Sequence, residues 1–268
     1  MPTILVTGAS SGFGHALCIR LARCGWQVFG ASRTVGSADD DFVMLPVDVR
    51  SDESVAACVA AIQARAGAID VLVNNAGYVH EGPLEEIGVA GLKAVFETNF
   101  FGVARMVDAV LPVMRAQRRG RIINVGSVAG LIPLPFYGAY CASKHALEGY
   151  TEALHHEVGP LGIEVAIVEP AFYRTRSAEH KLQSSCLIPD YEPHRSRMLA
   201  ALAAEEAKAP APDPVVRRLE RLVTDRRPIR LRNVIGKYTF DYWLRGVVPE
   251  RIWHRGVRIF WQLDRPGR

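Results

Sequence analysis

Short apolar runs alternate with longer amphipathic stretches along most of the chain. Each run spans four to six residues and is rich in Val, Ile and Leu. Runs of this kind are typical of strands that are buried on both faces of a sheet. The expected strands are residues 3–6, 27–31, 42–47, 69–73, 120–125, 163–168 and 229–234.

Between these runs, apolar residues recur at helical spacing. The expected helices are 15–24, 54–65, 84–97, 100–118, a helix that includes Tyr140, then 238–244 and 249–263. Strands and helices that alternate in this way predict an α/β fold with a doubly wound parallel sheet. We expect one domain over residues 1–268. Its segment 175–227 is too long for a tight connection and is expected to form a helical lid, and 236–263 a C-terminal helical extension.

The composition indicates an ordinary globular protein. Of the 268 residues 49% are hydrophobic and 22% charged, which suffices for a full core. The net charge is +4, but residues 211–268 hold 14 Lys and Arg against 6 Asp and Glu. This basic end could meet a phosphate, an anionic membrane or only solvent. We expect no nucleic-acid partner.

The five cysteines have no metal-binding spacing, so we expect reduced thiols and no metal site. With no signal peptide and no long apolar span, a cytoplasmic location is expected. The basic, Trp-bearing helix at 249–263 could lie on a membrane. We expect it instead to pack onto its own subunit or a neighbour.

A glycine-rich turn follows the first strand and precedes the first helix. Glycines let the backbone turn tightly and approach a ligand, and a helix N-terminus offers free N–H groups to phosphate. The arrangement predicts a nucleotide-binding cradle. Its expected contacts are Gly8, Ser10, Ser11, Gly12, Phe13 and Gly14.

The second expected strand ends at Ser32 and Arg33, without the acidic residue that would bond a ribose 2′-hydroxyl. Arg33 could pair with a 2′-phosphate, so we expect NADP(H), with NAD(H) as the alternative. Asp48, followed by Val49, could contact the adenine or cap the next helix. Further cofactor contacts are expected after the fourth strand, from Asn75, Ala76 and Gly77.

Tyr140 and Lys144 are four residues apart, so on a helix both lie on one face. An ammonium beside a phenol favours the phenolate and lowers its pKa. The Ser127 hydroxyl could hold a substrate oxygen while the charge on that oxygen changes. Together these residues could move a proton on or off an alcohol oxygen. Asn99 either breaks a long helix or holds a water.

Together and in this order, these motifs resemble those of the short-chain dehydrogenase/reductase family over about residues 3–175. The resemblance implies a seven-stranded Rossmann sheet and hydride transfer to or from a nicotinamide. It implies that Tyr140 is the acid/base and that Lys144 lowers its pKa and holds the nicotinamide ribose. Ser127 would orient the substrate oxygen, and Asn99 would support a water chain to Lys144.

The resemblance also implies contacts near the nicotinamide from Pro170 and Thr175. The chain departs from the family where Ala171 stands in place of a common glycine. The apolar loop 131–137 and the lid resemble the branch that acts on steroids, retinoids and other lipophilic carbonyls. The expected substrate contacts are Ser127, Leu134, Phe136, Tyr140, Phe172 and Tyr173.

The sequence therefore predicts an oxidoreductase that transfers hydride between NADP(H) and a lipophilic secondary alcohol or ketone. One alternative is a nucleotide-sensing binding protein, although a sensor would need only the cradle. Another is an NAD-preferring dehydrogenase of a small polar alcohol. Arg174, Arg176 and Lys181 could instead hold an acidic substrate. By resemblance, a homodimer or homotetramer is expected.

Overall fold

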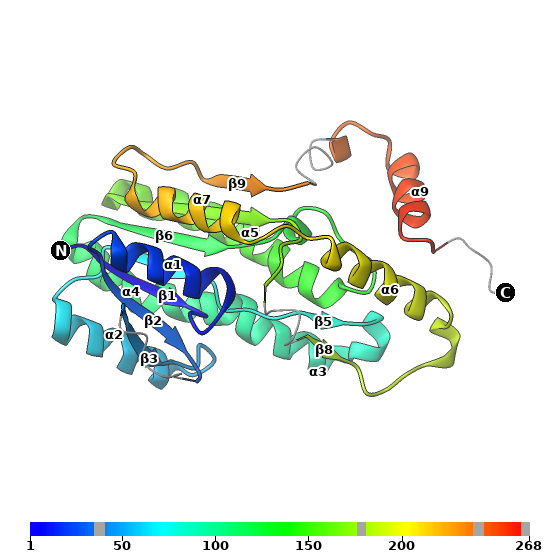
Figure 1. Ribbon diagram of the computed structural model, residues 1–268, viewed down its shortest axis with the longest axis horizontal. Coiled ribbons are helices and arrows are strands. Elements are labelled where there is room, and N and C mark those ends of the chain that lie inside the picture. Colours follow the sequence, from blue (N-terminus) through cyan, green and yellow to red (C-terminus); the bar gives the residue numbers. More distant parts are fainter. Residues whose placement is uncertain (35–40, 176–180, 238–243, 264–268) are drawn as a thin grey trace.

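A seven-stranded parallel sheet forms the centre of the computed structural model, which describes residues 1–34, 41–175, 181–237 and 244–263 (Figure 1). Its strand order is β3-β2-β1-β4-β6-β7-β9. The strands are β1 (Thr3–Thr7), β2 (Gln27–Ser32), β3 (Val43–Pro46), β4 (Val71–Asn74), β6 (Gly120–Val125), β7 (Ile163–Pro170) and β9 (Arg232–Ile235). The predicted doubly wound α/β fold is confirmed.

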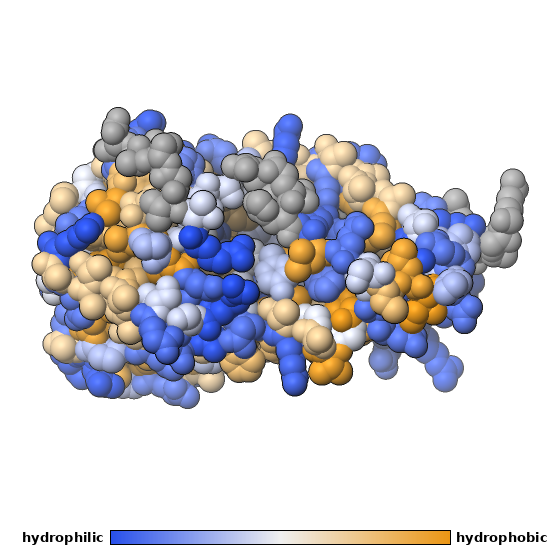
Figure 2. Space-filling view, turned by 90° about the horizontal axis from the view of Figure 1, so that it is seen from below, coloured by the Kyte–Doolittle hydropathy of each residue, from blue (hydrophilic) through white to orange (hydrophobic). Residues whose placement is uncertain are grey.

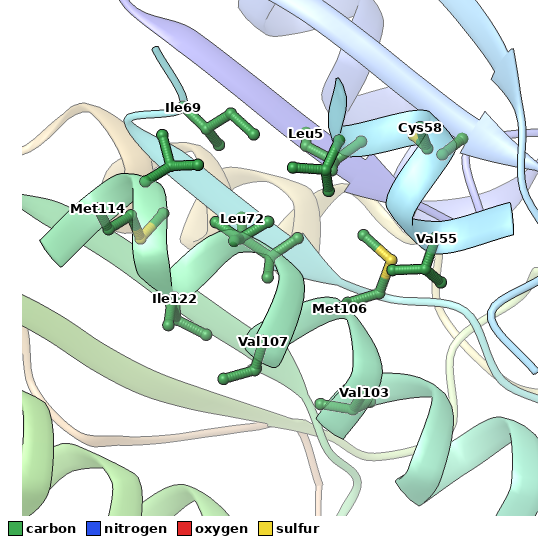
Figure 3. Close-up of a cluster of buried hydrophobic side chains, with 14 of the residues drawn as sticks. Leu5, Val55, Cys58, Ile69, Leu72, Val103, Met106, Val107, Met114 and Ile122 are labelled. Atoms are coloured by element: carbon green, nitrogen blue, oxygen red, sulfur yellow. The ribbon is translucent and has the colours of Figure 1, made fainter. Parts of the chain in front are cut away.

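Helices cover both faces of the sheet. On one face lie α2 (Asp52–Ala66), α4 (Gly102–Gln117) and α5 (Gly138–Val158); on the other lie α1 (Gly12–Arg23) and α7 (Asp213–Thr224). Successive strand residues point to opposite faces, so Leu5 packs with the first layer and Ile4 with the second. Figure 3 shows Leu5, Leu72 and Ile122 from adjacent strands beside Met106 of α4.

The two helices expected on either side of Asn99 are one continuous element, so the alternative that Asn99 breaks a long helix is wrong. A π-helical turn, η1 (Glu97–Phe101), joins α3 (Leu84–Phe96) to α4. By length and composition alone, this element could cross a membrane. Its second half packs against the sheet through buried Val103, Met106 and Val107, as a core helix does.

The lid is shorter than expected. Helix α6 (His194–Ala207) buries Met198 and Leu202, whereas α7 lies beside α1 in the layer that covers the sheet. Leu219 of α7 is fully buried there, so residues 213–224 belong to the core. A second, two-stranded sheet, absent from the sequence prediction, pairs β5 (His80–Glu81) with β8 (Leu182–Gln183).

The C-terminal helix α9 (Glu250–Phe260) lies near α6 (Figure 1). Its expected apolar stripe is divided. Trp261 is buried with Met198, while Ile252 and Phe260 are exposed. Most of the helix expected at 238–244 falls outside the described residues. Figure 2 shows hydrophobic residues in patches among hydrophilic ones on the face that it presents. Independently of that view, Leu84, Val89, Leu182 and Leu187 are among the exposed apolar side chains.

A buried ion pair fastens α6 to the start of α3. Arg195 bonds Glu86, and their side chains are 8% and 1% exposed. Arg195 also donates from Nε to Glu192, at 2.9 Å. Removal of one partner of a buried pair leaves an uncompensated charge in the interior.

Arg195→Ala should therefore lower the free energy of unfolding by about 3–5 kcal/mol, measured by urea denaturation. Arg217→Ala is the matched control. Its pair with Asp213 spans 2.7 Å, but both side chains are about half exposed. We expect Arg217→Ala to lower the free energy of unfolding by at most about 1 kcal/mol. Equal losses in the two variants would contradict the role assigned to the buried pair.

Candidate active site

A cavity of about 710 Å³ opens at the carboxyl ends of the central strands. Its wall includes Gly8 after β1, Asn75 after β4, Ser127 after β6 and Ala171 after β7. Carboxyl ends of parallel strands meet at one edge of a sheet, where α/β proteins bind their ligands. The topology thus brings the sequence motifs into one cavity.

Most of the predicted site residues line this cavity. They are Gly8, Ser10, Ser11, Gly12, Phe13, Ser32, Arg33, Asp48, Val49, Asn75, Ala76, Gly77, Ser127, Leu134, Tyr140, Lys144, Pro170, Phe172, Tyr173 and Thr175. Three predicted residues, Gly14, Asn99 and Phe136, do not line it.

Gly14 shapes the cradle from beneath. A Cβ at this position would lie 2.6 Å from the Gly8 carbonyl oxygen and 2.7 Å from Asn75 Nδ2. Asn75 Nδ2 donates to the carbonyl oxygens of Thr7 and Gly8, at 3.0 and 3.1 Å. Gly8 itself has a φ of +66°, which glycine adopts without strain. The backbone of the turn is therefore packed so closely against Asn75 that neither glycine could carry a side chain without a shift of its neighbours.

Asn99 is fully buried behind the cavity wall. Its Oδ1 accepts from the Tyr78 amide at 3.0 Å, and its Nδ2 donates to the Tyr78 carbonyl at 2.9 Å and to Ser143 Oγ at 3.2 Å. A Cβ on Gly77 would lie 3.1 Å from Asn99 Oδ1 and 3.9 Å from Lys144 Nζ. Asn99 thus ties the Tyr78 backbone to α5 next to Lys144.

Phe136 was predicted to contact substrate, but it is not among the residues that line the cavity. Its φ is +61°, and its ring packs edge-on against Tyr191 with centroids 6.4 Å apart. The next residue, Tyr137, lines the cavity instead. The sequence of this apolar loop has no periodicity that would show which of these two neighbours lines the cavity.

Ser127, Tyr140 and Lys144 converge on the cavity. Ser127 Oγ accepts from the Ala129 amide at 3.1 Å and donates to the Pro170 carbonyl at 3.4 Å, which orients the hydroxyl. Lys144 Nζ donates to the Val125 carbonyl at 2.7 Å and lies 5.8 Å from the centre of the Tyr140 ring. A phenol, a serine hydroxyl and an ammonium therefore share one buried corner.

The expected lowering of the Tyr140 pKa by Lys144 is not found. Burial raises the pKa of Tyr140 to about 12, and the nearby Ser127 hydroxyl opposes this rise. Burial also lowers the pKa of Lys144 to about 8. Desolvation disfavours the charged form of both groups, and here it outweighs their proximity.

A charged cluster missed by the sequence analysis lies behind Lys144. Glu148, one helical turn onward, raises the pKa of Lys144 against the effect of burial. Burial raises the pKa of Glu148 itself to about 7, and Arg232 opposes this through an ion pair. Buried Glu169 accepts from the Asn233 amide at 2.8 Å and lies 3.8 Å from Arg232. The lysine thus belongs to a network that reaches β9.

At the other end of the cavity lie Arg33, Asp48 and Arg50. A hydrogen bond from Arg50, at 2.6 Å, lowers the pKa of Asp48 to about 2, with a smaller contribution from Arg33. Ser51, and not Asp48, caps α2 by accepting from the Ser54 amide, so the capping alternative for Asp48 is wrong. Arg33 is exposed and makes no ion pair with any residue in the described ranges.

The lid side of the cavity differs from the expected cationic surface. Lys181 pairs with Glu81 at 2.5 Å and also with Glu206, so its charge is already matched. Arg174 lines the cavity, and Arg176 lies outside the described residues. Lys181 therefore gives no support to the alternative of an acidic substrate.

Comparisons with known proteins agree with this geometry. A family model described as short chain dehydrogenase matches residues 2–185. The chain is 36% identical to a 3-ketodihydrosphingosine reductase of Bacteroides thetaiotaomicron over 264 residues, which cover 97% of this chain and 98% of that protein. It is 41% identical to human retinol dehydrogenase 8 over 182 residues, covering 63% of this chain and 58% of that protein.

A solved structure of a short-chain dehydrogenase from Streptomyces avermitilis superposes with a TM-score of 0.81 at 31% identity, covering 98% of both chains. The likeness thus spans the sheet, the lid and the C-terminal region. The predicted resemblance to the short-chain dehydrogenase/reductase family is confirmed.

Lys144→Met tests the cost of burying the ammonium. Between its pKa of about 8 in the folded protein and its ordinary value of 10.5, the unfolded chain binds the proton more tightly. Wild-type stability should therefore rise with pH relative to the variant, by roughly 1 kcal/mol between about pH 7 and about pH 9. Urea denaturation at both pH values measures it.

The exposed Lys208→Met is the matched control, because it removes an ammonium without changing the interior. If the difference in free energy of unfolding between the wild type and Lys144→Met stays constant with pH, this prediction is wrong.

Proposed function

The chain belongs to the short-chain dehydrogenase/reductase family and is an NAD(P)-dependent oxidoreductase; from that premise, we propose that it transfers hydride between NADP(H) and a lipophilic secondary alcohol or ketone. The observation that carries the proposal is that Ser127, Tyr140 and Lys144 line one cavity, with Lys144 Nζ 5.8 Å from the centre of the Tyr140 ring. The glycine-rich turn lines the same cavity.

The residues present fit a dinucleotide. Gly8 and Gly14 keep the turn free of side chains, and a Cβ at either position would meet backbone or side-chain atoms within 2.8 Å. Ser11 and Gly12 at the start of α1 would hold the diphosphate with the helix N-terminus. When bound, the nicotinamide supplies or accepts the hydride.

Proton transfer is the part of the reaction that we assign to side chains of this chain. In the reductive direction, Tyr140 donates its hydroxyl proton to the oxygen of the carbonyl, and in the oxidative direction it takes that proton back. Ser127 holds the same oxygen in position. A phenol with a raised pKa stays protonated at neutral pH, which suits it to act as the acid. While Lys144 is protonated, its ammonium places a positive charge near the Tyr140 ring.

Arg33 supports a preference for NADP(H). Its guanidinium is exposed at the cavity wall and has no ion-pair partner among the described residues, whereas Arg50 is engaged by Asp48. A guanidinium suits a 2′-phosphate, to which it donates charge-assisted hydrogen bonds.

The walls near Tyr140 support a lipophilic substrate over a small polar one. Leu134 and Phe172 belong to one hydrophobic cluster with Tyr140 and line the cavity, as do Val128 and Leu182. The relatives named for a retinol and a ketosphingoid substrate are consistent with such a pocket. We also propose a cytoplasmic homodimer or homotetramer, which light scattering of the purified protein and cell fractionation test.

Tyr140→Phe should lower kcat by roughly 100- to 10,000-fold, because it removes only the hydroxyl that moves the proton. Cofactor affinity should stay within about twofold. Steady-state turnover of long-chain secondary alcohols and titration of cofactor fluorescence measure the two quantities. Tyr150→Phe, on the same helix but outside the cavity wall, is the control. Full activity of Tyr140→Phe, or no turnover by the wild type, would exclude the proposed reaction.

Arg33→Ala should weaken NADP(H) binding about tenfold and change NAD(H) binding little, since only NADP(H) carries the 2′-phosphate. Titration calorimetry with both cofactors measures this. Arg23→Ala, an exposed arginine at the far end of α1, should alter neither affinity. Equal losses for both cofactors would refute the role of Arg33.

A further inference from the structure

Lys144 is a buried cation whose direct partner is a neutral group. The residue is only 5% exposed. Its Nζ donates to the Val125 carbonyl at 2.7 Å, and it makes no ion pair with any residue in the described ranges. Burial in such surroundings favours the neutral amine unless a negative charge lies nearby. The ammonium form of Lys144 therefore depends on an anionic group close to it.

Glu148 is placed to supply that charge. It follows Lys144 by one turn of α5, so both side chains lie on one face of the helix. A Cβ on Gly126 would lie 3.3 Å from Glu148 Oε1, and the carbonyl that accepts from Lys144 belongs to the preceding residue, Val125. The carboxylate and the ammonium thus reach the same peptide unit at the end of β6. Glu148 is only 6% exposed, so solvent screens its charge little.

The groups around Glu148 hold its carboxylate and leave its charge available to Lys144. Arg232 of β9 bonds Glu148 Oε2 and also pairs with the exposed Glu152, at 2.8 Å. Glu148 Oε1 has no hydrogen-bond partner among the described residues. Burial and the charge of Glu148 raise the pKa of the neighbouring Glu169 to about 8, so Glu169 is mostly neutral at pH 7. In the described part of the chain, the titratable groups that face Lys144 and Glu148 are Tyr140 and Glu152 on α5, Glu169 on β7 and Arg232 on β9.

The charge of Lys144 matters when the Tyr140 proton is transferred. In the reductive direction the O–H bond of Tyr140 breaks, its proton moves to the substrate oxygen, and a phenolate remains. Lys144 Nζ lies 5.8 Å from the centre of the Tyr140 ring, so an ammonium there stabilises the phenolate and a neutral amine does not. Burial lowers the pKa of Lys144 to about 8, and the charge of Glu148 opposes this shift. The charged fraction of Lys144 near neutral pH is therefore sensitive to Glu148.

Resting on the proposed function, we propose that Glu148 is a positioning residue for the reaction: its buried carboxylate keeps Lys144 in the ammonium form while Tyr140 gives up its proton. Arg232 fixes this carboxylate through Oε2. Glu148 does not line the cavity, so it acts on the reaction only through Lys144. An ion pair that merely fastened β9 to α5 would not change how the rate depends on pH.

The test is the pH profile of kcat/KM for reduction of a long-chain ketone by NADPH, in the wild type and in Glu148→Gln. Glutamine keeps the shape and loses the charge, so the pKa of Lys144 should fall by about one unit or more. The alkaline limb of the profile should move down in pH by the same amount. The two kcat/KM values should agree within about twofold at pH 6 and differ by about five- to tenfold between about pH 8 and about pH 9. Glu152→Gln, which removes the exposed carboxylate bonded to the same arginine, should keep the wild-type profile.

An unmoved alkaline limb in Glu148→Gln would overturn the proposal. So would a loss of kcat/KM of equal size at every pH, which is the mark of a merely structural ion pair.

Urea denaturation at about pH 7.5 of the wild type, Glu148→Gln, Lys144→Met and the double variant gives a readout without turnover. The effect of Glu148→Gln on the unfolding equilibrium constant should be at least about threefold larger in the wild-type background than in the Lys144→Met background. Equal effects in the two backgrounds overturn the proposal. If no ketone is reduced, the proposed reaction fails, whereas this cycle still decides whether Glu148 supplies the charge that Lys144 needs.

Discussion

The parallel pairing of the central strands is the constraint on which the site depends. Val6 of β1 pairs with Val73 of β4, Val73 with Ile123 of β6, and Ile123 with Ala166 of β7. Since all four strands run in one direction, the chain leaves each of them at the same edge of the sheet. Both faces are covered by helices, so a shift in register would disturb both hydrophobic layers. The position of the cavity follows from this packing.

The same packing opposes charge inside the site. Tyr140 is half-buried and Lys144 is buried, and desolvation shifts the pKa of each group so that its neutral form is favoured. The fold compensates with specific partners: the Val125 carbonyl accepts from Lys144, and Arg232 bonds Glu148. A phenol and an ammonium at one corner are therefore not enough to produce a phenolate.

Sequence reasoning located what depends on local pattern and failed where distant contacts decide. The strands were recognisable because both of their faces are buried, and the glycine-rich turn and the Tyr140–Lys144 spacing carry their own geometry. The π turn at Asn99 and the exchange of Phe136 for Tyr137 at the wall have no such pattern. Helix α7 resembles a lid segment in composition, and only its contact with α1 makes it core. The partners of Glu206 are remote in sequence.

The reactive groups and the part of the cavity wall that the lid supplies have different structural support. Ser127, Tyr140 and Lys144 follow β6 or lie on α5, whose positions the sheet determines. Glu206 lies near the end of α6, and the beginning of that helix is held by the buried pair of Arg195 with Glu86. A change in the docking of α6 would move Glu206 while the reactive corner keeps its contacts with β6. Substrate choice in this fold can therefore vary through the lid without loss of the chemistry.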